Sequence, residues 1–240
     1  MFDNIEALKA QLDAMRPLPR HTVKSLRENL VLEWTYNSNA IEGNTLTLNE
    51  TKVVLEGITV GGKSLREHFE AINHREAIYW VESLVAHREP LSIYLIRQIH
   101  QIVLKNIDDN NAGKFRSENV VISGASHTPP DFTRVSELME LLVAGYGTSG
   151  FHPIEKACRL HTDFVNIHPF VDGNGRTARL LLNLSLIQDG WLPVVIKAVD
   201  RASYYDALDV ACISDDYSQF VGMVVALQEE TLKKHLSLCV

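Results

Sequence analysis

The sequence predicts an all-α fold, and three observations support it. Apolar residues recur every three or four positions along most of the chain, which is the spacing that places them on one face of a helix. Residues 47–50 (TLNE) and 64–67 (SLRE) have the spacing of capping boxes, in which a hydroxyl and a carboxylate satisfy the free amides at a helix start. The composition, 45% hydrophobic and 22% charged, is that of a folded globular protein.

The helices follow one another along the chain with short connections. The first runs from Phe2 to Met15 on its apolar face and ends before Pro17, and the second is marked by Val23 to Trp34 and stops near Gly43. Further helices are predicted over residues 48–58, 64–86, 92–107, 134–146, 153–167, 175–189, 201–213 and 216–235.

One segment, residues 113–131, does not fit the helical pattern. It contains a short β-prone run at residues 119–123, followed by Gly124 and by the pair Pro129 and Pro130, none of which suits a helix. We therefore expect a small β-hairpin that forms a flap over the helical body.

Charge and composition exclude several classes of protein. The net charge is −7 and no block of consecutive basic residues could follow a phosphate backbone, so nucleic acid is not an expected partner. The N-terminus lacks the features of a secretory signal, no segment is long and apolar enough to span a membrane, and the three cysteines are scattered. We expect a cytoplasmic protein without a membrane partner, and the sequence is compatible with a homo-oligomer.

A glycine-rich turn between two predicted helices is the clearest candidate for chemistry. The helix over residues 153–167 reaches His168, and Pro169 blocks its continuation. The turn DGNG, residues 172–175, then leads into the next helix. Such a turn aims several backbone N–H groups at one point, and the helix dipole strengthens their attraction for an anion. The pattern therefore predicts a phosphate site.

Side chains around this turn supply the other groups that nucleotide chemistry needs. Arg176 and Arg179 share a helix face, where their guanidinium groups can bind phosphate oxygens. Asp172 supplies the single carboxylate that Mg²⁺ bridging two phosphates commonly needs. His168, with an ordinary pKa of about 6.5, can accept a proton from an attacking hydroxyl. Each feature alone is common at helix ends, so the prediction depends on their joint occurrence.

On these residues the chain resembles a known family. HPFVDGNGRTAR, residues 168–179, matches every defined position of HxFx(D/E)GNGRxxR, the signature of the Fic (filamentation induced by cAMP) family. The resemblance implies the helical Fic fold and transfer of AMP from ATP to a Ser, Thr or Tyr hydroxyl of a target protein, or of the enzyme itself. It implies these roles: His168 as the base, Asp172 as the Mg²⁺ ligand, and Gly173, Asn174, Gly175, Arg176 and Arg179 as nucleotide-binding residues.

Two other stretches resemble the family less specifically. GKFR at residues 113–116, followed by NVVISGASHTPP, resembles the flap whose strand edge pairs with the backbone of the target. DRASYYDAL at residues 200–208 resembles the stretch in which Tyr204 and Tyr205 shape the adenine pocket, although aromatic core residues of a helix would look the same. The flap residues expected at the target are Val120, Val121, Ile122, Ser123, Gly124 and His127.

A second motif resembles the inhibitory segment of some Fic proteins. SNAIEGN, residues 38–44, matches (S/T)xxxE(G/N), although by physics alone it is an ordinary helix end with Gly43 in the C-cap region. The resemblance implies that Glu42, in a motif with Ser38 and Gly43, pairs with Arg179 and blocks productive ATP binding. We therefore divide the chain into an N-terminal helical region, residues 1–90, with the inhibitory motif, and a Fic domain, residues 91–235, with the flap at about 113–131 and the signature at 168–179.

Other functions remain compatible with the sequence. Some relatives transfer UMP, phosphocholine or phosphate, and in some the inhibitory glutamate supports removal of AMP by activating water. A metal-dependent phosphohydrolase would need His161, Asp163, His168 and Asp172 as ligands, but Pro169 and the turn separate Asp172 from the helix face. A helical binding protein with a silent nucleotide site is the non-enzymatic alternative.

Overall fold

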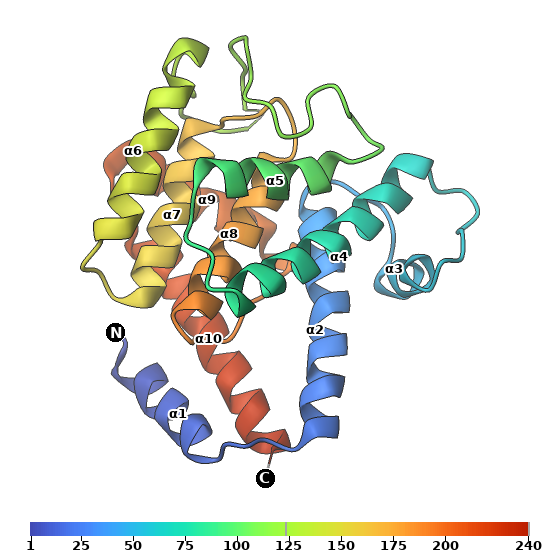
Figure 1. The fold of residues 1–240 in the computed structure, drawn as a ribbon, viewed down its shortest axis with the longest axis vertical. Coiled ribbons are helices and arrows are strands. Elements are labelled where there is room, and N and C mark those ends of the chain that lie inside the picture. The colour runs from blue at the N-terminus through green and yellow to red at the C-terminus, as the bar shows by residue number, and fades with distance from the viewer. Residues whose placement is uncertain (123, 240) are drawn as a thin grey trace.

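The structure is a computed structural model that describes residues 1–122 and 124–239, and these residues form ten α-helices and two short 3₁₀ turns (Figure 1). The first five helices are α1 (Asp3–Ala14), α2 (Arg20–Ile41), α3 (Leu48–Leu55), α4 (Leu65–Ala86) and α5 (Ile93–Leu104). The others are α6 (Val135–Thr148), α7 (Pro153–Ile167), α8 (Asn174–Gln188), α9 (Arg201–Ser214) and α10 (Ser218–Leu238), with 3₁₀ turns at η1 (Phe132–Arg134) and η2 (Ala198–Asp200). The all-helical prediction is confirmed.

Local sequence signals account for most helix ends. Both predicted capping boxes are complete: the side chain of Thr47 accepts from the N–H of Glu50 and the side chain of Glu50 accepts in return, and Ser64 and Glu67 do the same. The predicted helix over 48–58 ends earlier, at Leu55, because the chain turns at Gly57 with φ +87°.

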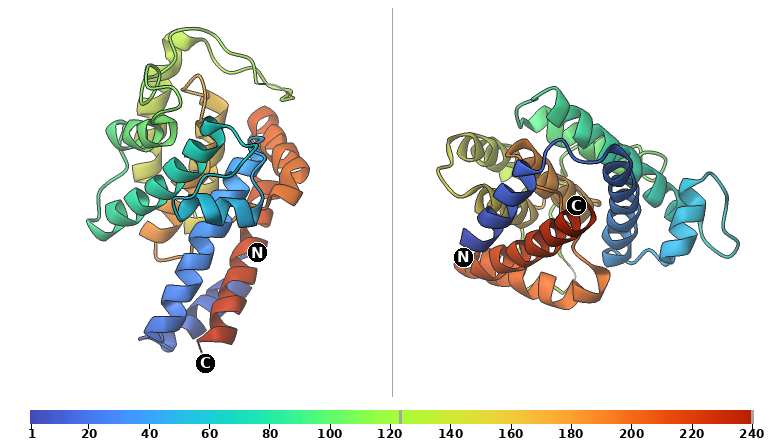
Figure 2. Two further views of the ribbon diagram at one scale, coloured as in Figure 1. Left: turned by 90° about the vertical axis from the view of Figure 1, so that its right-hand side faces the viewer. Right: turned by 90° about the horizontal axis from the view of Figure 1, so that it is seen from below.

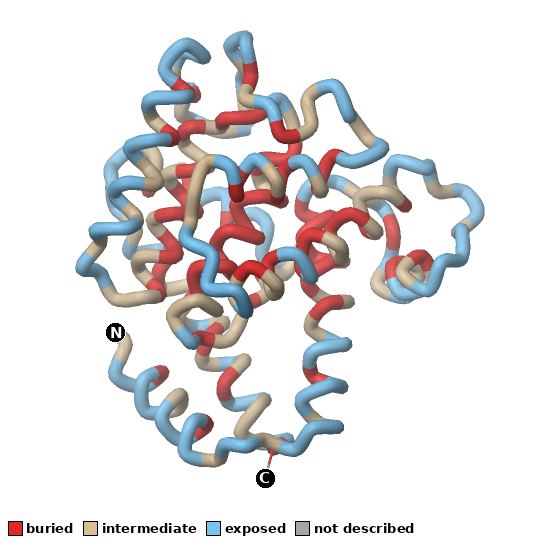
Figure 3. The backbone as a smooth tube through the Cα atoms, in the orientation of Figure 1, coloured by how far each residue is buried: buried red, intermediate tan, exposed pale blue. Residues whose placement is uncertain are grey.

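The core surrounds α7 and α8, which lie in the middle of the molecule (Figure 3). One apolar cluster joins these two helices to α2, α4, α5 and α6, and a second joins them to α1, α9 and α10. Helix α8 is buried almost all round, and even its polar residues Asn174, Asn183 and Ser185 are inaccessible to solvent. Because α8 begins with the signature residues, the core holds one wall of the candidate site rigidly in place.

Helices α1 and α3 lie at the periphery of the molecule (Figure 1). Helix α1 packs against α10 through Ile5 and Leu12, and α3 projects from the body beside α4 (Figures 1 and 2). The two predicted regions share core contacts, since Trp34 and Ile78 pack in the same cluster as Ile99 and Phe164. Of the helices in residues 1–122 and 124–239, none has the length and apolar character needed to cross a membrane.

The predicted β-hairpin is wrong: within the described residues the segment 113–131 contains no strand and runs as an irregular loop. Pro129 and Pro130 have no N–H group, so one limb cannot donate in a ladder. Side chains hold the loop instead. The guanidinium of Arg116 donates to the carbonyl oxygens of Glu118 and Pro130, and Asn119 donates to the Asp131 carboxylate. The β-prone residues have no partner strand in the part of the chain that the structure describes.

Candidate active site

The signature loop joins α7 to α8 in a fixed conformation. Helix α7 ends at Ile167, and His168 takes the left-handed conformation with φ +49° just before Pro169. The amide of Asn174 closes the loop, since its Oδ1 accepts from the N–H of Phe170 and its Nδ2 donates to the carbonyl of Phe170, at 3.0 and 2.8 Å. Asn174 therefore shapes the loop from inside the protein and is itself buried.

A buried histidine of α5 supports the same loop. The ring of His100 stacks on Phe170 with a centroid distance of 3.6 Å, and its Nδ1 accepts from the N–H of Gly113. Nε2 must then carry the proton, and it donates to the carbonyl of Asp172 at 2.8 Å. Burial lowers the pKa of His100 to about 4, so the ring is neutral at physiological pH. His100 thus fixes the backbone between Phe170 and Gly173.

Arg116 joins the flap to the signature loop. Its Nε donates to the carbonyl of His168 at 2.9 Å, and its own N–H donates to the carbonyl of Pro169. The side chain is only 4% exposed, so these contacts are shielded from water. The position of His168 is consequently set from two sides, by α7 and by the base of the flap.

The imidazole of His168 is in the neutral form at physiological pH. Burial lowers the pKa of His168 to about 4, and the neighbouring Val165 carbonyl offsets part of this shift. Within the described residues, Nδ1 of His168 has no hydrogen-bond partner. A neutral imidazole can accept a proton, which is what a general base requires.

Arg179 of α8 is buried and held by residues of α2. Its Nε donates to Ser38 Oγ at 2.9 Å, and its Nη2 donates both to the Ser38 carbonyl at 2.8 Å and to Glu42 Oε1 at 2.6 Å. Burial acts to lower the pKa of Arg179, but the negative charge of Glu42 outweighs it, so the pKa lies above its ordinary value. The ion pair connects residues 137 positions apart, so the tertiary fold creates it.

Gly175 makes room for this ion pair. A Cβ atom at position 175 would lie 2.2 Å from Glu42 Oε1 and 3.1 Å from Arg179 Nη1. The carboxylate of Glu42 therefore lies directly over the first turn of α8, where no side chain caps the helix. The first-turn N–H groups of a helix have no partners within the helix, so the Glu42 carboxylate lies where an anion is favoured.

A cavity of about 800 Å³ opens beside these groups. This volume is within the range of about 300–1,000 Å³ that small-molecule sites usually have. Its polar lining comes from His168, Arg179 and Glu42 and also from Arg201, Asp206 and Asp209, and its apolar lining includes Ile122, Val165, Val199 and Leu208. The arrangement suits a ligand with a flat apolar part and an anionic part.

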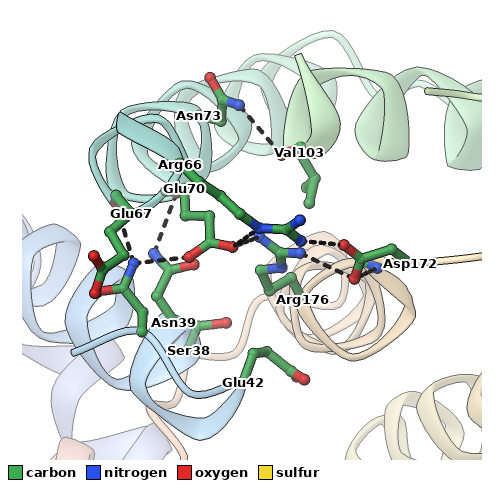
Figure 4. A network of polar contacts seen from close by, with 12 residues as sticks. Ser38, Asn39, Glu42, Arg66, Glu67, Glu70, Asn73, Val103, Asp172 and Arg176 are labelled. Atoms are coloured by element: carbon green, nitrogen blue, oxygen red, sulfur yellow. Dashed lines mark hydrogen bonds and ion pairs between the residues drawn. The ribbon is translucent and has the colours of Figure 1, made fainter. Parts of the chain in front are cut away.

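Asp172 and Arg176 do not line this cavity, because their side chains turn toward α4. Asp172 Oδ1 accepts from the N–H of Gly173 and pairs with Arg176, and Oδ2 pairs with Arg66 (Figure 4). Burial would raise the pKa of Asp172, but the charge of Arg176, the Gly173 N–H and the charge of Arg66 outweigh it and lower the pKa below its ordinary value. Asp172 is therefore ionised.

Comparison with known proteins now identifies the family. The family model described as Fic/DOC matches residues 90–186. The solved structure of Fic-1 from C. elegans is 32% identical with a TM-score of 0.86, and the match covers 98% of this chain and 71% of that one. This chain belongs to the Fic/DOC family.

Other Fic relatives agree over nearly the whole chain. A Fic domain containing signaling protein from Bacteroides thetaiotaomicron has a TM-score of 0.91 at 29% identity, with 99% of this chain and 97% of that chain covered. The protein named protein adenylyltransferase Fic from Nematostella vectensis is 36% identical over 242 positions, which cover 99% of this chain and 56% of that protein. The chain therefore spans about half the length of the curated relatives it matches.

The two tyrosines expected at the Fic adenine pocket lie at different depths. Tyr205 is 38% exposed and lines the cavity. Tyr204 is 1% exposed, its hydroxyl bonds to His161 Nε2 at 2.9 Å, and it accepts from Arg179 Nη1 at 3.5 Å. Tyr204 also lines the cavity, so it is both a buried core residue and a lining residue.

The flap residues are also divided. Ile122, Gly124 and His127 line the cavity, whereas Val121 is 88% exposed and points away from it. The Asp209 carboxylate of α9 accepts from His127 Nδ1 and holds the loop over the cavity. Val120 is half-buried outside the cavity lining, and Ser123 lies outside the described residues.

Several residues that support the site were not recognised from the sequence. The supporting role of His100, which occupies an apolar position of the strongly amphipathic helix α5 and orients the loop, is not predicted from the sequence. The same is true of the contacts that Arg116, Arg66 and Glu70 make with the signature loop and with its residues Asp172 and Arg176. A histidine between Ile99 and Val103 on a core-facing stripe is the one sequence signal that could have pointed to such a residue.

Proposed function

We propose that this chain transfers AMP from ATP to a hydroxyl group of a protein, and that Glu42 holds the transfer in check. The observation that carries the proposal is that three groups line one nucleotide-sized cavity: the neutral imidazole of His168, the buried Arg179, and Gly175 in the first turn of α8, where no side chain caps the helix.

The cavity suggests how the nucleotide would lie. The phosphates would bind at the N-terminus of α8, where the N–H groups of residues 174–176 and the helix dipole attract an anion. Arg179 would bind the terminal phosphate oxygens once Glu42 leaves it. The base would lie between the apolar walls near Ile122 and Leu208, with Tyr205 at the side. ATP is the nucleotide that the names of the curated relatives favour.

His168 would serve as the general base. The hydroxyl oxygen of the target attacks the α-phosphorus, the bond from that phosphorus to the bridging oxygen of pyrophosphate breaks, and the hydroxyl proton passes to the His168 imidazole. Because His168 is half-buried and neutral, it is ready to accept the proton at physiological pH. Arg116 and the end of α7 position it through its backbone.

Asp172 is the residue that would hold magnesium, although its side chain faces α4 and does not line the cavity. It is ionised, its side chain is 40% exposed, and within the described residues Oδ2 pairs with the exposed side chain of Arg66 alone. Mg²⁺ needs few protein ligands because it retains water and binds the phosphates as well. When bound, it would neutralise charge on the phosphate oxygens.

The contact between Glu42 and Arg179 supports the inhibitory role. Glu42 occupies the guanidinium that the terminal phosphate needs, and its carboxylate lies 2.2 Å from the Cβ position of Gly175, where a phosphate would have to pass. A bound carboxylate and a triphosphate compete for the same positive end of α8.

The variant Glu42→Gly tests both parts of the proposal. We expect a clear gain in labelled AMP attached to protein when it is incubated with ATP labelled in the α-phosphate, with the chain itself and a cell lysate as targets. Glu56→Gly is the matched control, because Glu56 also caps a helix C-terminus with nearly the same backbone angles and is followed by a glycine. If Glu42→Gly transfers no more AMP than the wild type and this control, the inhibitory role of Glu42 is refuted.

A second candidate reaction is removal of AMP from a modified protein. Glu42 lines the same cavity as His168 and is 32% exposed on its side chain, so it is placed to orient a water molecule there. Release of AMP from a pre-labelled target by the wild type, but not by Glu42→Gly, is the expected result for this reaction.

The residues that a metal-dependent phosphohydrolase would need do not form a set of metal ligands. His161 bonds to Tyr204 and Asp163 accepts from Tyr217, so neither faces Asp172. Over residues 1–122 and 124–239 there is no group of three or more metal-binding side chains.

A further inference from the structure

Two arginines and two carboxylates form a closed ring next to the signature loop (Figure 4). Arg66 Nη2 lies 2.5 Å from Asp172 Oδ2, and Arg66 Nε lies 3.1 Å from Glu70 Oε1. Arg176 lies 3.3 Å from each of the same two carboxylates. Charges of opposite sign alternate around the ring, so the charge of Asp172 is compensated on both of its oxygens.

The two arginines of the ring differ in how firmly they are held. Arg176 is 2% exposed and lies in the first turn of the buried helix α8. Arg66 is 56% exposed, is the second residue of α4 and has no other ion pair within the described residues. A long exposed side chain can move away from its partner at small cost, because exposed ion pairs are weak. Arg66 is therefore the movable member.

Arg66 also occupies the oxygen that a cation would use. Asp172 Oδ1 is directed inward, where it accepts from the Gly173 N–H and contacts Arg176. Over residues 1–122 and 124–239, the one hydrogen-bonding partner of Oδ2 is Arg66. A cation at Oδ2 would meet a like charge within a few ångströms, and like charges disfavour each other there.

We propose that Arg66 competes with the divalent cation for Asp172 and so sets the metal affinity of the site. This inference rests on the proposed function, since it takes Asp172 as the metal ligand. Arg66 acts through Asp172, so it is a positioning residue and not a catalytic one.

The ring is also joined to the inhibitory motif. Glu70 Oε2 accepts from Asn44 Nδ2 at 2.8 Å, and Asn44 lies two residues after Glu42. Glu70 holds Arg66 through its other oxygen. The Glu70 carboxylate thus contacts both Arg66 and the turn that follows Glu42, so the ring and the inhibitory motif belong to one hydrogen-bond network.

The test measures binding of Mn²⁺, which takes oxygen ligands like Mg²⁺ and is visible by electron paramagnetic resonance. All proteins carry Glu42→Gly and are saturated with ADP, whose affinity is first measured in EDTA. For Arg66→Ala and Arg66→Gln we expect Mn²⁺ to bind roughly twofold to fivefold more tightly, which corresponds to loss of one exposed ion pair. Arg66→Lys, which keeps the charge, should stay near the parent.

Matched controls separate competition from a structural effect. Arg27→Ala removes a similarly exposed arginine that pairs with Glu82 on the other side of α4, and it should leave Mn²⁺ affinity unchanged. In an Asp172→Asn background the Arg66→Ala effect should vanish, and the ADP affinity in EDTA should be the same for every Arg66 variant.

The outcomes distinguish the inference from the function on which it rests. Unchanged or weaker Mn²⁺ binding in Arg66→Ala, with normal ADP binding, would overturn the competition while the nucleotide site stands. Absence of ADP binding in every variant would overturn the nucleotide site and the competition with it.

Discussion

Gly175→Ala offers a sharp test of the packing between Glu42 and α8. The added methyl group would lie 2.2 Å from Glu42 Oε1, which is far closer than atoms can approach, so one of the two must move. Because Glu42 Oε1 is the end of a flexible, partly exposed side chain, we expect the carboxylate to move outward and to lose its ion pair with Arg179. The free energy of unfolding should report this loss.

The magnitude can be worked from the contacts. Breaking a fully buried ion pair costs about 3–5 kcal/mol, and because Glu42 is one third exposed we expect about 1–3 kcal/mol here. Replacing glycine by alanine within a helix returns about 0.5–1 kcal/mol. Gly175→Ala should therefore destabilise the wild type by roughly 1–2 kcal/mol.

The sign should reverse when Glu42 is absent. In a Glu42→Ala background the atom nearest to the methyl group is Arg179 Nη1, at 3.1 Å, so Gly175→Ala should be neutral or stabilise by up to about 1 kcal/mol. Urea unfolding of the wild type, both single variants and the double variant gives the coupling energy directly. Equal effects of Gly175→Ala in both backgrounds would refute the proposed packing of the carboxylate over α8.

Three more predictions concern histidines. His168→Ala should keep the fold and nucleotide binding but lose transfer by about 10²-fold or more, measured with labelled ATP in the Glu42→Gly background; a variant as fast as its parent contradicts the base assignment. In the same background the transfer rate should stay level from pH 8 down to about 5 and fall below that as His168 takes up a proton, since its pKa is about 4; a decline centred near pH 6.5 would show that burial does not shift this group. His100→Phe keeps an aromatic ring on Phe170 but leaves two buried backbone groups without partners, and should destabilise the protein by about 2–4 kcal/mol in urea unfolding, whereas a loss below about 0.5 kcal/mol would contradict its supporting role.

Buried histidines also predict how stability depends on pH. Burial lowers the pKa of His74, His100 and His161 in the folded state, so below about pH 6.5 the unfolded chain binds more protons than the folded one. Stability should therefore fall as pH drops from about 6.5 to 5, by up to about 1.4 kcal/mol per pH unit for each of these groups. Urea midpoints that stay constant over this window would refute the buried neutral state of the rings.

Local chemistry in the sequence was sufficient for most of the secondary structure and for the turn that carries the site. Hydroxyl and carboxylate pairs at Thr47 and Ser64 start helices within four residues, and Pro169 ends α7 wherever the rest of the chain goes. These interactions join neighbours in the chain, so no knowledge of packing is needed. The pairing of Glu42 with Arg179 was expected only through family resemblance, since a glutamate at a helix end otherwise suggests an exposed surface residue.

Contacts between distant residues depended on how the helices pack. β-prone residues at 119–122 remain a loop, because residues 1–122 and 124–239 contain no strand with which they could pair. Asp172 faces α4 because Arg66, 106 positions away, is brought beside it. The role of His100 depends on the packing of α5 against the signature loop, which the sequence of α5 alone does not reveal. Helix signals act over a few residues and can be read along the chain, whereas the direction of a side chain depends on partners that only folding brings within a few ångströms.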